Sequence, residues 1–116
     1  MTSLNAHANE LSSVDTLAPI FKASGDPLRL EILRVLRRDT FGVLELSQMF
    51  DMRQSGMSHH LKVLANAGLV STRREGNSIF YRRSLPVTEQ PWHRLHSQLL
   101  NELDSQPDDA QLQQAI

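Results

Sequence analysis

The chain has 116 residues, of which 40% are hydrophobic and 22% are charged, which is enough for one small folded domain and too little for two. It has no cysteine, which excludes disulfides, thiolate metal sites and cysteine nucleophiles. No apolar run approaches the ~20 residues that cross a bilayer and the polar N-terminus does not resemble a signal peptide, so we expect no membrane partner and a cytoplasmic location.

The net charge of -1 conceals an uneven distribution of charge along the chain. Acidic residues outnumber basic ones in both end segments, and the balance reverses between residues 53 and 83. There Glu75 is the single acid beside a set of basic residues: Arg53, Lys62, Arg73, Arg74, Arg82 and Arg83. Basic residues concentrated in one segment are typical of a surface that binds nucleic acid.

The N-terminal part of the chain predicts a helix after a polar start. Residues 1–13 are polar, and we expect a flexible N-terminus there. Leu17, Ile20 and Phe21 recur at helical spacing, which predicts a helix over residues 14–23.

A second helix is predicted directly after the first. Asp26 is a favourable N-cap, and Pro27 suits the first turn because its missing N–H needs no partner there. The apolar side of this helix is formed by four residues: Leu30, Ile32, Leu33 and Leu36.

Two helices with a tight connection follow residues 40–42, which are typical of a turn or one short strand. The first is predicted over residues 43–50, with four side chains inward: Val43, Leu46, Met49 and Phe50. The second is predicted over residues 54–67 and is closed by Gly68. So short a link is typical of a helix-turn-helix, whose second helix enters the DNA major groove.

The helix at residues 54–67 divides into two faces at about 100° per residue. One face is apolar: Met57, Leu61 and Leu64. The other face is polar and has no acid: Gln54, Ser55, Ser58, His59 and Lys62. A solvated helix face would usually include carboxylates, whereas hydroxyls, amides and a cation suit contact with base edges and phosphates.

A basic hairpin is predicted after this helix. Its strands span residues 70–75 and 78–83, and Gly76 and Asn77 are expected to supply the positive φ of a tight turn. Four arginines crowd the two strands: Arg73, Arg74, Arg82 and Arg83. Bound DNA would relieve their mutual repulsion, so helix and hairpin together predict binding to double-stranded DNA.

A last helix is predicted over residues 91–104, followed by a polar tail or linker at residues 105–116. The folded domain is therefore expected to span residues 14–104. An apolar stripe runs along the last helix: Trp92, Leu95, Leu99 and Leu103.

The apolar residues of the first and last helices have two interpretations. They can belong to the core of one chain, or they can form the interface of a homodimer, which we favour because the other helices already supply a core. The interface candidates are Leu17, Ile20, Phe21, Trp92, Leu95, Leu99 and Leu103. A two-fold dimer would present two such helices to a palindromic operator.

Three segments in this order, FKASGDPLRLEILRVL, QSGMSHHLKVLANAGLV and STRREGNSIFYRR, closely resemble the ArsR/SmtB family of bacterial repressors. The resemblance implies a winged helix-turn-helix, an α+β fold that is mainly α with a small β-hairpin: four helices, two strands and a last helix. It implies dimerisation through the first and last helices, and release from the operator when an effector binds. The family's DNA contacts fall here on Gln54, Ser55, Ser58 and His59, with Arg73, Arg74 and Asn77 in the wing.

The metal-binding residues of the family are absent from the corresponding positions. Where arsenic- and cadmium-sensing members carry cysteines, this chain has the sequence Val43-Leu44-Glu45-Leu46, and Leu85-Pro86-Val87 replaces the Asp-x-His of zinc sensors. His93 and His96 are spaced to share an ion but are weak metal candidates, because further ligands are not evident. We therefore expect no metal and no cofactor.

These observations predict a dimeric, sequence-specific regulator of transcription, a repressor that a non-metal effector such as a small molecule releases. The alternatives are a DNA-binding module that precedes a methyltransferase domain or responds to methionine-cycle metabolites, a metal sensor that uses His93 and His96, and a protein-binding module. No phosphate-binding loop, catalytic triad or carboxylate pair is evident, so we expect no enzyme. The effector, the operator and the sign of regulation stay open at this point.

Overall fold

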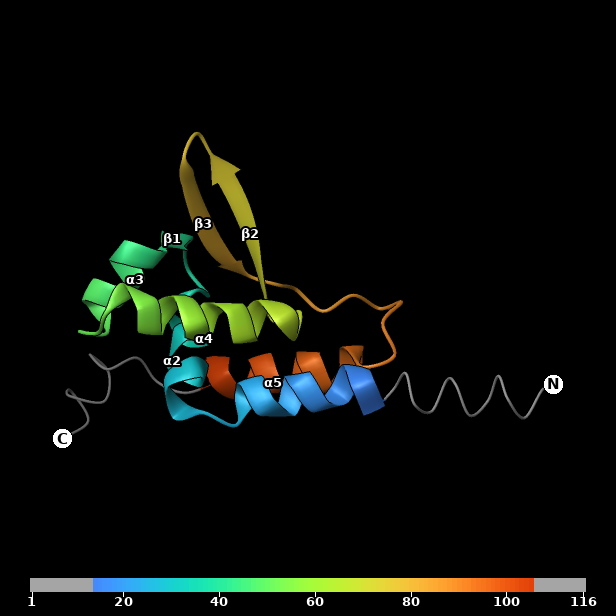
Figure 1. Cartoon of the computed structure of the whole chain (residues 1–116). Helices are drawn as coiled ribbons and strands as arrows, with labels where there is room; N and C mark the ends of the chain where they lie inside the picture. The colour runs from blue at the N-terminus through green and yellow to red at the C-terminus, as the bar shows by residue number, and fades with distance from the viewer. Residues whose placement is uncertain (1–13, 106–116) are drawn as a thin grey trace. The chain divides into compact units, whose positions relative to one another are not determined.

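The computed structural model describes residues 14–105. The predicted flexible N-terminus lies outside the described residues, as does the predicted tail after residue 105. The chain divides into two units, Met1–Leu85 and Pro86–Ile116. Most of the helices and all the strands of the described chain belong to the first unit, and α5 belongs to the second (Figure 1).

The two N-terminal helices of the first unit follow the sequence prediction closely. Residues 14–24 are helical, and α2 spans Pro27–Val35. The carboxylate of Asp26 accepts a hydrogen bond from the Leu28 N–H at 2.8 Å, so Asp26 is the N-cap that its position predicted. The buried residues of these two helices are Ile20, Ala23, Ile32 and Leu33.

The helix-turn-helix consists of α3 (Val43–Met49) and α4 (Gln54–Asn66). Asp51, directly after α3, has a φ of 52°, and its N–H donates to the Gln48 carbonyl at 3.2 Å. The Met52 N–H donates to the Ser47 carbonyl at 2.9 Å. This pair of hydrogen bonds is a Schellman motif, which reverses the chain and lets α4 begin at Gln54, three positions after Asp51.

The inward side of α3 differs from the prediction at one position. Leu46 is buried as expected, but Met49 is 52% exposed and Ser47 is buried in its place. At about 100° per residue, the buried side lies between Leu46 and Ser47, far around the helix from Met49. The Ser47 hydroxyl donates to the Leu44 carbonyl at 2.8 Å, which satisfies this polar group inside the core.

The apolar face of α4 is confirmed, because Met57, Leu61 and Leu64 are fully buried. Gly68 has a φ of 77°, and its N–H donates to the carbonyl oxygen of Ala65 at 3.0 Å. The N–H of the next residue, the buried Leu69, donates to the carbonyl of Leu64 at 3.0 Å. The predicted glycine stop is therefore a second Schellman motif, and it directs the chain from α4 into the hairpin.

The sheet has three antiparallel strands in the order β1-β3-β2. The hairpin strands β2 (Val70–Glu75) and β3 (Ser78–Arg83) have the predicted bounds. β1 is the two-residue strand Phe41–Gly42, in which Phe41 pairs with Tyr81 and Gly42 with Phe80. The segment before α3 is thus a strand, and it joins the helix-turn-helix to the middle of β3.

The hairpin turn differs from the prediction in its second residue. Gly76 has a φ of 60°, whereas the φ of Asn77 is not positive. A positive φ at the first central position alone is the pattern of a type II′ turn, which calls for glycine at that position only.

In the second unit, α5 spans His93–Asp104, two residues shorter at its start than predicted. The buried residues of this helix are His96 and Leu100, whereas the predicted stripe of Trp92, Leu95, Leu99 and Leu103 is half-buried. The rings of Trp92 and His96 stack with centroids 4.9 Å apart. No helix in the described part of the chain has the length and apolarity to cross a membrane.

Candidate nucleic-acid interface

The polar face of α4 is exposed along its whole length. Its residues Gln54, Ser55, Ser58, His59 and Lys62 are all exposed. Because the buried residues of α4 lie on the other side, the helix presents a continuous acid-free surface to solvent. This surface has the donors and acceptors that contact with base edges requires.

The start of α4 adds a second feature to this face. Arg53 is the N-cap, and its exposed side chain makes no capping hydrogen bond. The N–H groups of the first helical turn have no carbonyl partner within the helix, and the helix dipole adds positive potential there. A phosphate oxygen can satisfy both the amides and the charge.

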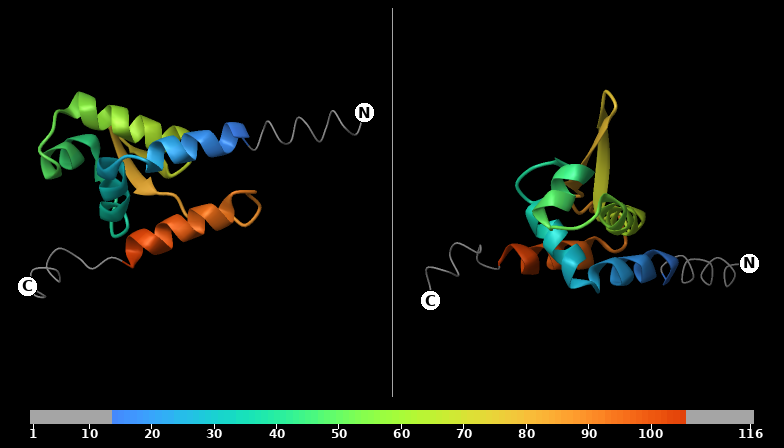
Figure 2. Two further views of the ribbon diagram at one scale, coloured as in Figure 1. Left: turned by 90° about the horizontal axis from the view of Figure 1, so that it is seen from below. Right: turned by 60° about the vertical axis from the view of Figure 1, so that its left-hand side comes forward.

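The hairpin extends beyond the helices of the first unit, as Figures 1 and 2 show. Arg73, Arg74 and Asn77 are exposed on it, as is Arg82. The strand register places Arg73 and Arg82 on one face of the hairpin and Arg74 on the other. Cations on both faces can approach the two sugar-phosphate strands that border a groove.

The four arginines of the hairpin have different environments, which the sequence did not distinguish. Arg73 pairs with Glu75 at 3.0 Å, and Arg82 donates to the Ser71 hydroxyl at 3.1 Å. Arg83 is half-buried and donates to the carbonyl oxygen of Leu33 in α2 at 3.2 Å. Arg83 therefore anchors the hairpin to the helices, and three of the four arginines have a partner within the protein.

Arg29 connects three helices of the first unit, a role that the sequence did not indicate. Its Nε donates to the Ala23 carbonyl and its Nη2 to the Lys22 carbonyl, both at 2.9 Å. Its Nη1 lies 3.1 Å from His60 Nδ1 in α4 and 3.4 Å from Asp26 Oδ2. No sequence motif reveals such a contact, because Arg29 and His60 are far apart along the chain.

The carboxyl group of Asp26 is stabilised in its ionised form. Burial alone would raise the pKa of Asp26, but the hydrogen bond from the Leu28 N–H and the guanidinium of Arg29 outweigh that cost. The pKa of Asp26 consequently lies below its ordinary value of 3.8.

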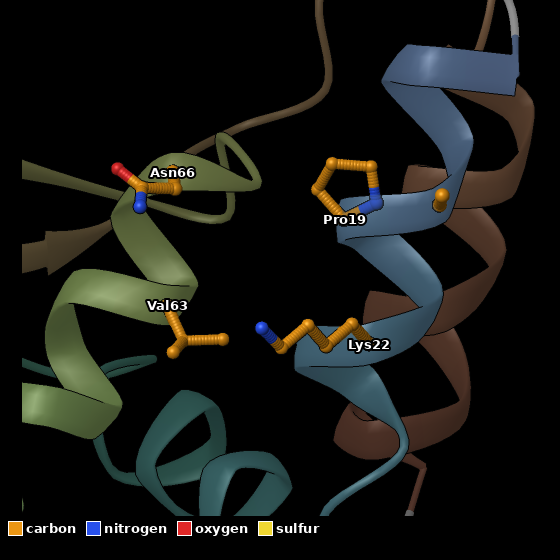
Figure 3. A pocket seen from close by; sticks show the side chains of 5 residues that line it. Pro19, Lys22, Val63 and Asn66 are labelled. Carbon is orange, nitrogen blue, oxygen red and sulfur yellow. The ribbon is translucent and has the colours of Figure 1, made fainter.

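A groove of about 500 Å³ lies between the helical segment 14–24 and α4. It is lined by Ala18, Pro19, Lys22, Val63 and Asn66, and the Lys22 amine points across it toward Val63 (Figure 3). The lining is mainly apolar with one ammonium group.

The weak metal candidates are not arranged as a metal site. His93 Nδ1 lies 3.2 Å from the Gln90 carbonyl oxygen, and His96 is buried against Trp92. Within residues 14–105, no three His, Cys, Asp or Glu side chains are grouped to hold an ion.

The candidates for a dimer interface differ in exposure. Ile20 is buried within the single chain, whereas Phe21 on the same helix is 58% exposed. Leu17 is half-buried, as are the four candidates in and beside α5. Their assignment to an interface stays a prediction.

A short helix, a tight turn, an exposed polar helix and a projecting hairpin together define a winged helix-turn-helix. A solution NMR structure described as the homodimeric winged helix-turn-helix DNA-binding domain of a possible ArsR-family regulator from Mycobacterium bovis is similar, with a TM-score of 0.65 and 26% sequence identity. The similarity covers 85% of this chain and 88% of that one. The predicted α+β winged fold is confirmed.

Residues 26–72 match the family model described as "Bacterial regulatory protein, arsR family". The transcriptional activator HlyU of Vibrio cholerae is 37% identical over 82 residues, which are 68% of this chain and 76% of HlyU. The arsenical resistance operon repressor of Staphylococcus xylosus is 39% identical over 70 residues, 60% of this chain and 67% of that protein. The chain belongs to the ArsR family of DNA-binding transcriptional regulators.

Proposed function

We propose that this protein is a homodimeric, sequence-specific repressor that leaves its operator when a non-metal effector binds. One observation carries the proposal: the exposed side of α4 has no acidic residue, and a projecting hairpin with exposed arginines follows that helix. A helix that served only as a solvated surface would not need this restriction.

In this proposal α4 lies in the major groove. Ser55, Ser58 and His59 contact base edges, because hydroxyl and imidazole groups can donate and accept hydrogen bonds there. Gln54 adds an amide near the start of the helix, where the amides of the first turn attract a phosphate. Lys62 contacts the sugar-phosphate backbone.

The hairpin forms the wing of this interface. Arg73 and Arg74 bind phosphates or enter the minor groove, and Asn77 at the turn adds a polar contact. The ion pair between Arg73 and Glu75 is exposed on both sides, so it costs little to exchange Glu75 for a phosphate.

Dimerisation doubles this surface and selects a palindromic operator. The homodimeric state of the similar mycobacterial domain supports this step. We place the interface on the apolar residues of the first and last helices: Leu17, Ile20, Phe21, Trp92, Leu95, Leu99 and Leu103.

The proposal includes the kind of signal and the sign of regulation. A non-metal effector is proposed because the cysteines and the Asp-x-His of metal-sensing members are absent from this sequence. Repression requires only that a bound dimer block access to a promoter, and the staphylococcal relative is named as a repressor. Because HlyU is named as an activator, transcription from a reporter with and without the protein tests the sign of regulation.

The proposal also places the protein in the cytoplasm, because a regulator that binds the bacterial chromosome acts there. It includes no catalytic step.

The test compares Ser58→Ala and His59→Ala with the wild type on a chromosomal site found by mapping bound DNA. Loss of a base contact should weaken operator binding by about 1–3 kcal/mol, roughly 5- to 150-fold in Kd, while binding to unrelated DNA changes little. Asn66→Ala is the matched control, since Asn66 is a polar, exposed residue of α4 outside the proposed contact set. Unchanged operator affinity in both variants would overturn the assignment of α4.

A further inference from the structure

Arg29 connects three segments of the first unit: the end of the helical segment 14–24, the start of α2, and α4, the proposed recognition helix. Its side chain is only 12% exposed, and two of its nitrogens hold the carbonyl groups of Lys22 and Ala23 at the end of the helical segment 14–24. A third nitrogen faces both Asp26 at the start of α2 and His60 in α4. A guanidinium with this many partners has little freedom to move.

The contact between Arg29 and His60 indicates the tautomer of the imidazole. A guanidinium can only donate hydrogen bonds, so His60 Nδ1 at 3.1 Å must accept. The tautomer that fits this contact carries its hydrogen on Nε2.

His60 is in turn in contact with a proposed base-contacting residue. Its ring and that of His59 meet edge to face, with centroids 6.0 Å apart and planes inclined by 60°. His59 is exposed, whereas His60 is half-buried between His59 and Arg29. The orientation of the His60 ring therefore limits the positions open to the His59 ring.

We propose that Arg29 is a positioning residue for DNA recognition: through His60, it sets the orientation of α4 and of the His59 side chain. The inference rests on the proposed function, because it assigns His59 to base contact. Arg29 itself touches no DNA in this arrangement. Arg29 contacts α4 on the side that faces the other helices. Its loss should therefore weaken sequence-specific binding to DNA more than non-specific binding to phosphates.

The first test uses the protein without DNA. Nitrogen-15 NMR of the histidine rings should show the Nε2–H form of His60 in the wild type and a mixture of the two neutral forms in Arg29→Gln. The backbone amide signals of His59 and His60 should shift in Arg29→Gln. Arg34→Gln is the matched control, because it removes the same charge from the same helix and Arg34 pairs with Glu31 of that helix at 3.1 Å. Unchanged α4 signals in Arg29→Gln would overturn the proposal whether or not the protein binds DNA.

The second test measures binding to the operator and to unrelated DNA. Arg29→Gln should weaken operator binding about tenfold, as expected for loss of a charge-assisted hydrogen bond, and change non-specific binding by less than about twofold. His60→Gln removes the ring through which Arg29 is proposed to act and should also weaken operator binding. Adding Arg29→Gln to His60→Gln should then weaken it little further, because the two residues act as one unit.

The outcomes separate this proposal from the proposed function. If the wild type binds no specific site while Arg29→Gln still shifts the α4 signals, the DNA-binding function fails and the positioning of α4 stands. If Arg29→Gln unfolds, His60→Gln decides the matter, because an operator affinity equal to that of the wild type would show that His60 does not transmit the effect of Arg29.

Discussion

At the scale of the residue, the connection between α3 and α4 depends on a conformation that its amino acid tolerates but does not favour. Asp51 is the single described residue other than glycine with a positive φ. Aspartate adopts this left-handed region more readily than most side chains, and glycine adopts it freely. The sequence predicted a tight link here, but the aspartate gave no signal of the backbone geometry.

Replacing Asp51 tests how much strain this connection contains. Asp51→Ala should lower the free energy of unfolding by about 1 kcal/mol, because alanine lacks the local hydrogen bonding that helps aspartate at positive φ. Asp51→Gly should leave stability equal or raise it by up to about 1 kcal/mol. Chemical denaturation of the two variants provides the measurement, and each is the charge control for the other. Equal stabilities of the alanine and glycine variants would contradict the assigned backbone conformation.

Other residue-level features differ in how far the sequence revealed them. Asp26 before Pro27 and Gly68 after α4 have local signatures, since each acts within one helical turn of its own position. Arg29 and Arg83 have no such signature, because their partners, His60 and Leu33, are distant in sequence. Long-range hydrogen bonds of this kind depend on how the helices meet, which residue spacing does not specify.

At the scale of the element, the helix and strand bounds agreed with the sequence prediction to within about two residues, because amphipathic spacing and end signals are strong in this chain. The exception is the interior of α3, where a seven-residue helix has too few apolar positions to define its buried side. The sequence does not decide between a turn and a strand for β1, because two residues show no alternation and the pairing partner lies in β3.

The wing makes its own prediction, because its arginines are proposed to contact phosphates. Arg73→Ala combined with Arg74→Ala should weaken binding to all DNA sequences. It should also reduce the slope of log Kd against log salt by about 1 for each lost contact. Measurement of Kd by fluorescence anisotropy at several salt concentrations gives the slope.

A control pair with the same charge change is available in Arg37→Ala combined with Arg38→Ala, both exposed after α2. These substitutions should leave the slope near that of the wild type. If the wing variant also keeps the wild-type slope, the hairpin does not contact the DNA backbone.

At the scale of the whole molecule, the predicted domain of residues 14–104 and its dimer interface stay predictions. The sequence placed an apolar stripe on the last helix, and within α5 the burial is greatest instead at His96 and Leu100. Half-buried leucines beside them retain apolar surface that a second protomer can cover. A pattern of spacing alone does not separate core from interface, because both require the same apolar residues.

Leu99→Asp tests this interface. A buried carboxylate without a partner is costly, so the variant should sediment as a monomer and lose most of its operator affinity. Gln98→Asp is the matched control, since it adds the same charge at the neighbouring exposed position and should remain dimeric. A dimer that survives in Leu99→Asp at micromolar concentration would move the interface elsewhere.

The position of β3 at the centre of the sheet has a consequence for how the wing forms. Phe80 and Tyr81 have strand partners on both sides, whereas residues toward the turn have a partner on one side. Pairing of β3 with β1 requires closure of a long loop from Phe41 to Tyr81, whereas β2 and β3 pair across a two-residue turn, so we expect the hairpin to form before β1 joins it. The half of the hairpin near the turn has no third strand, which would let the proposed wing bend to the local width of a DNA groove.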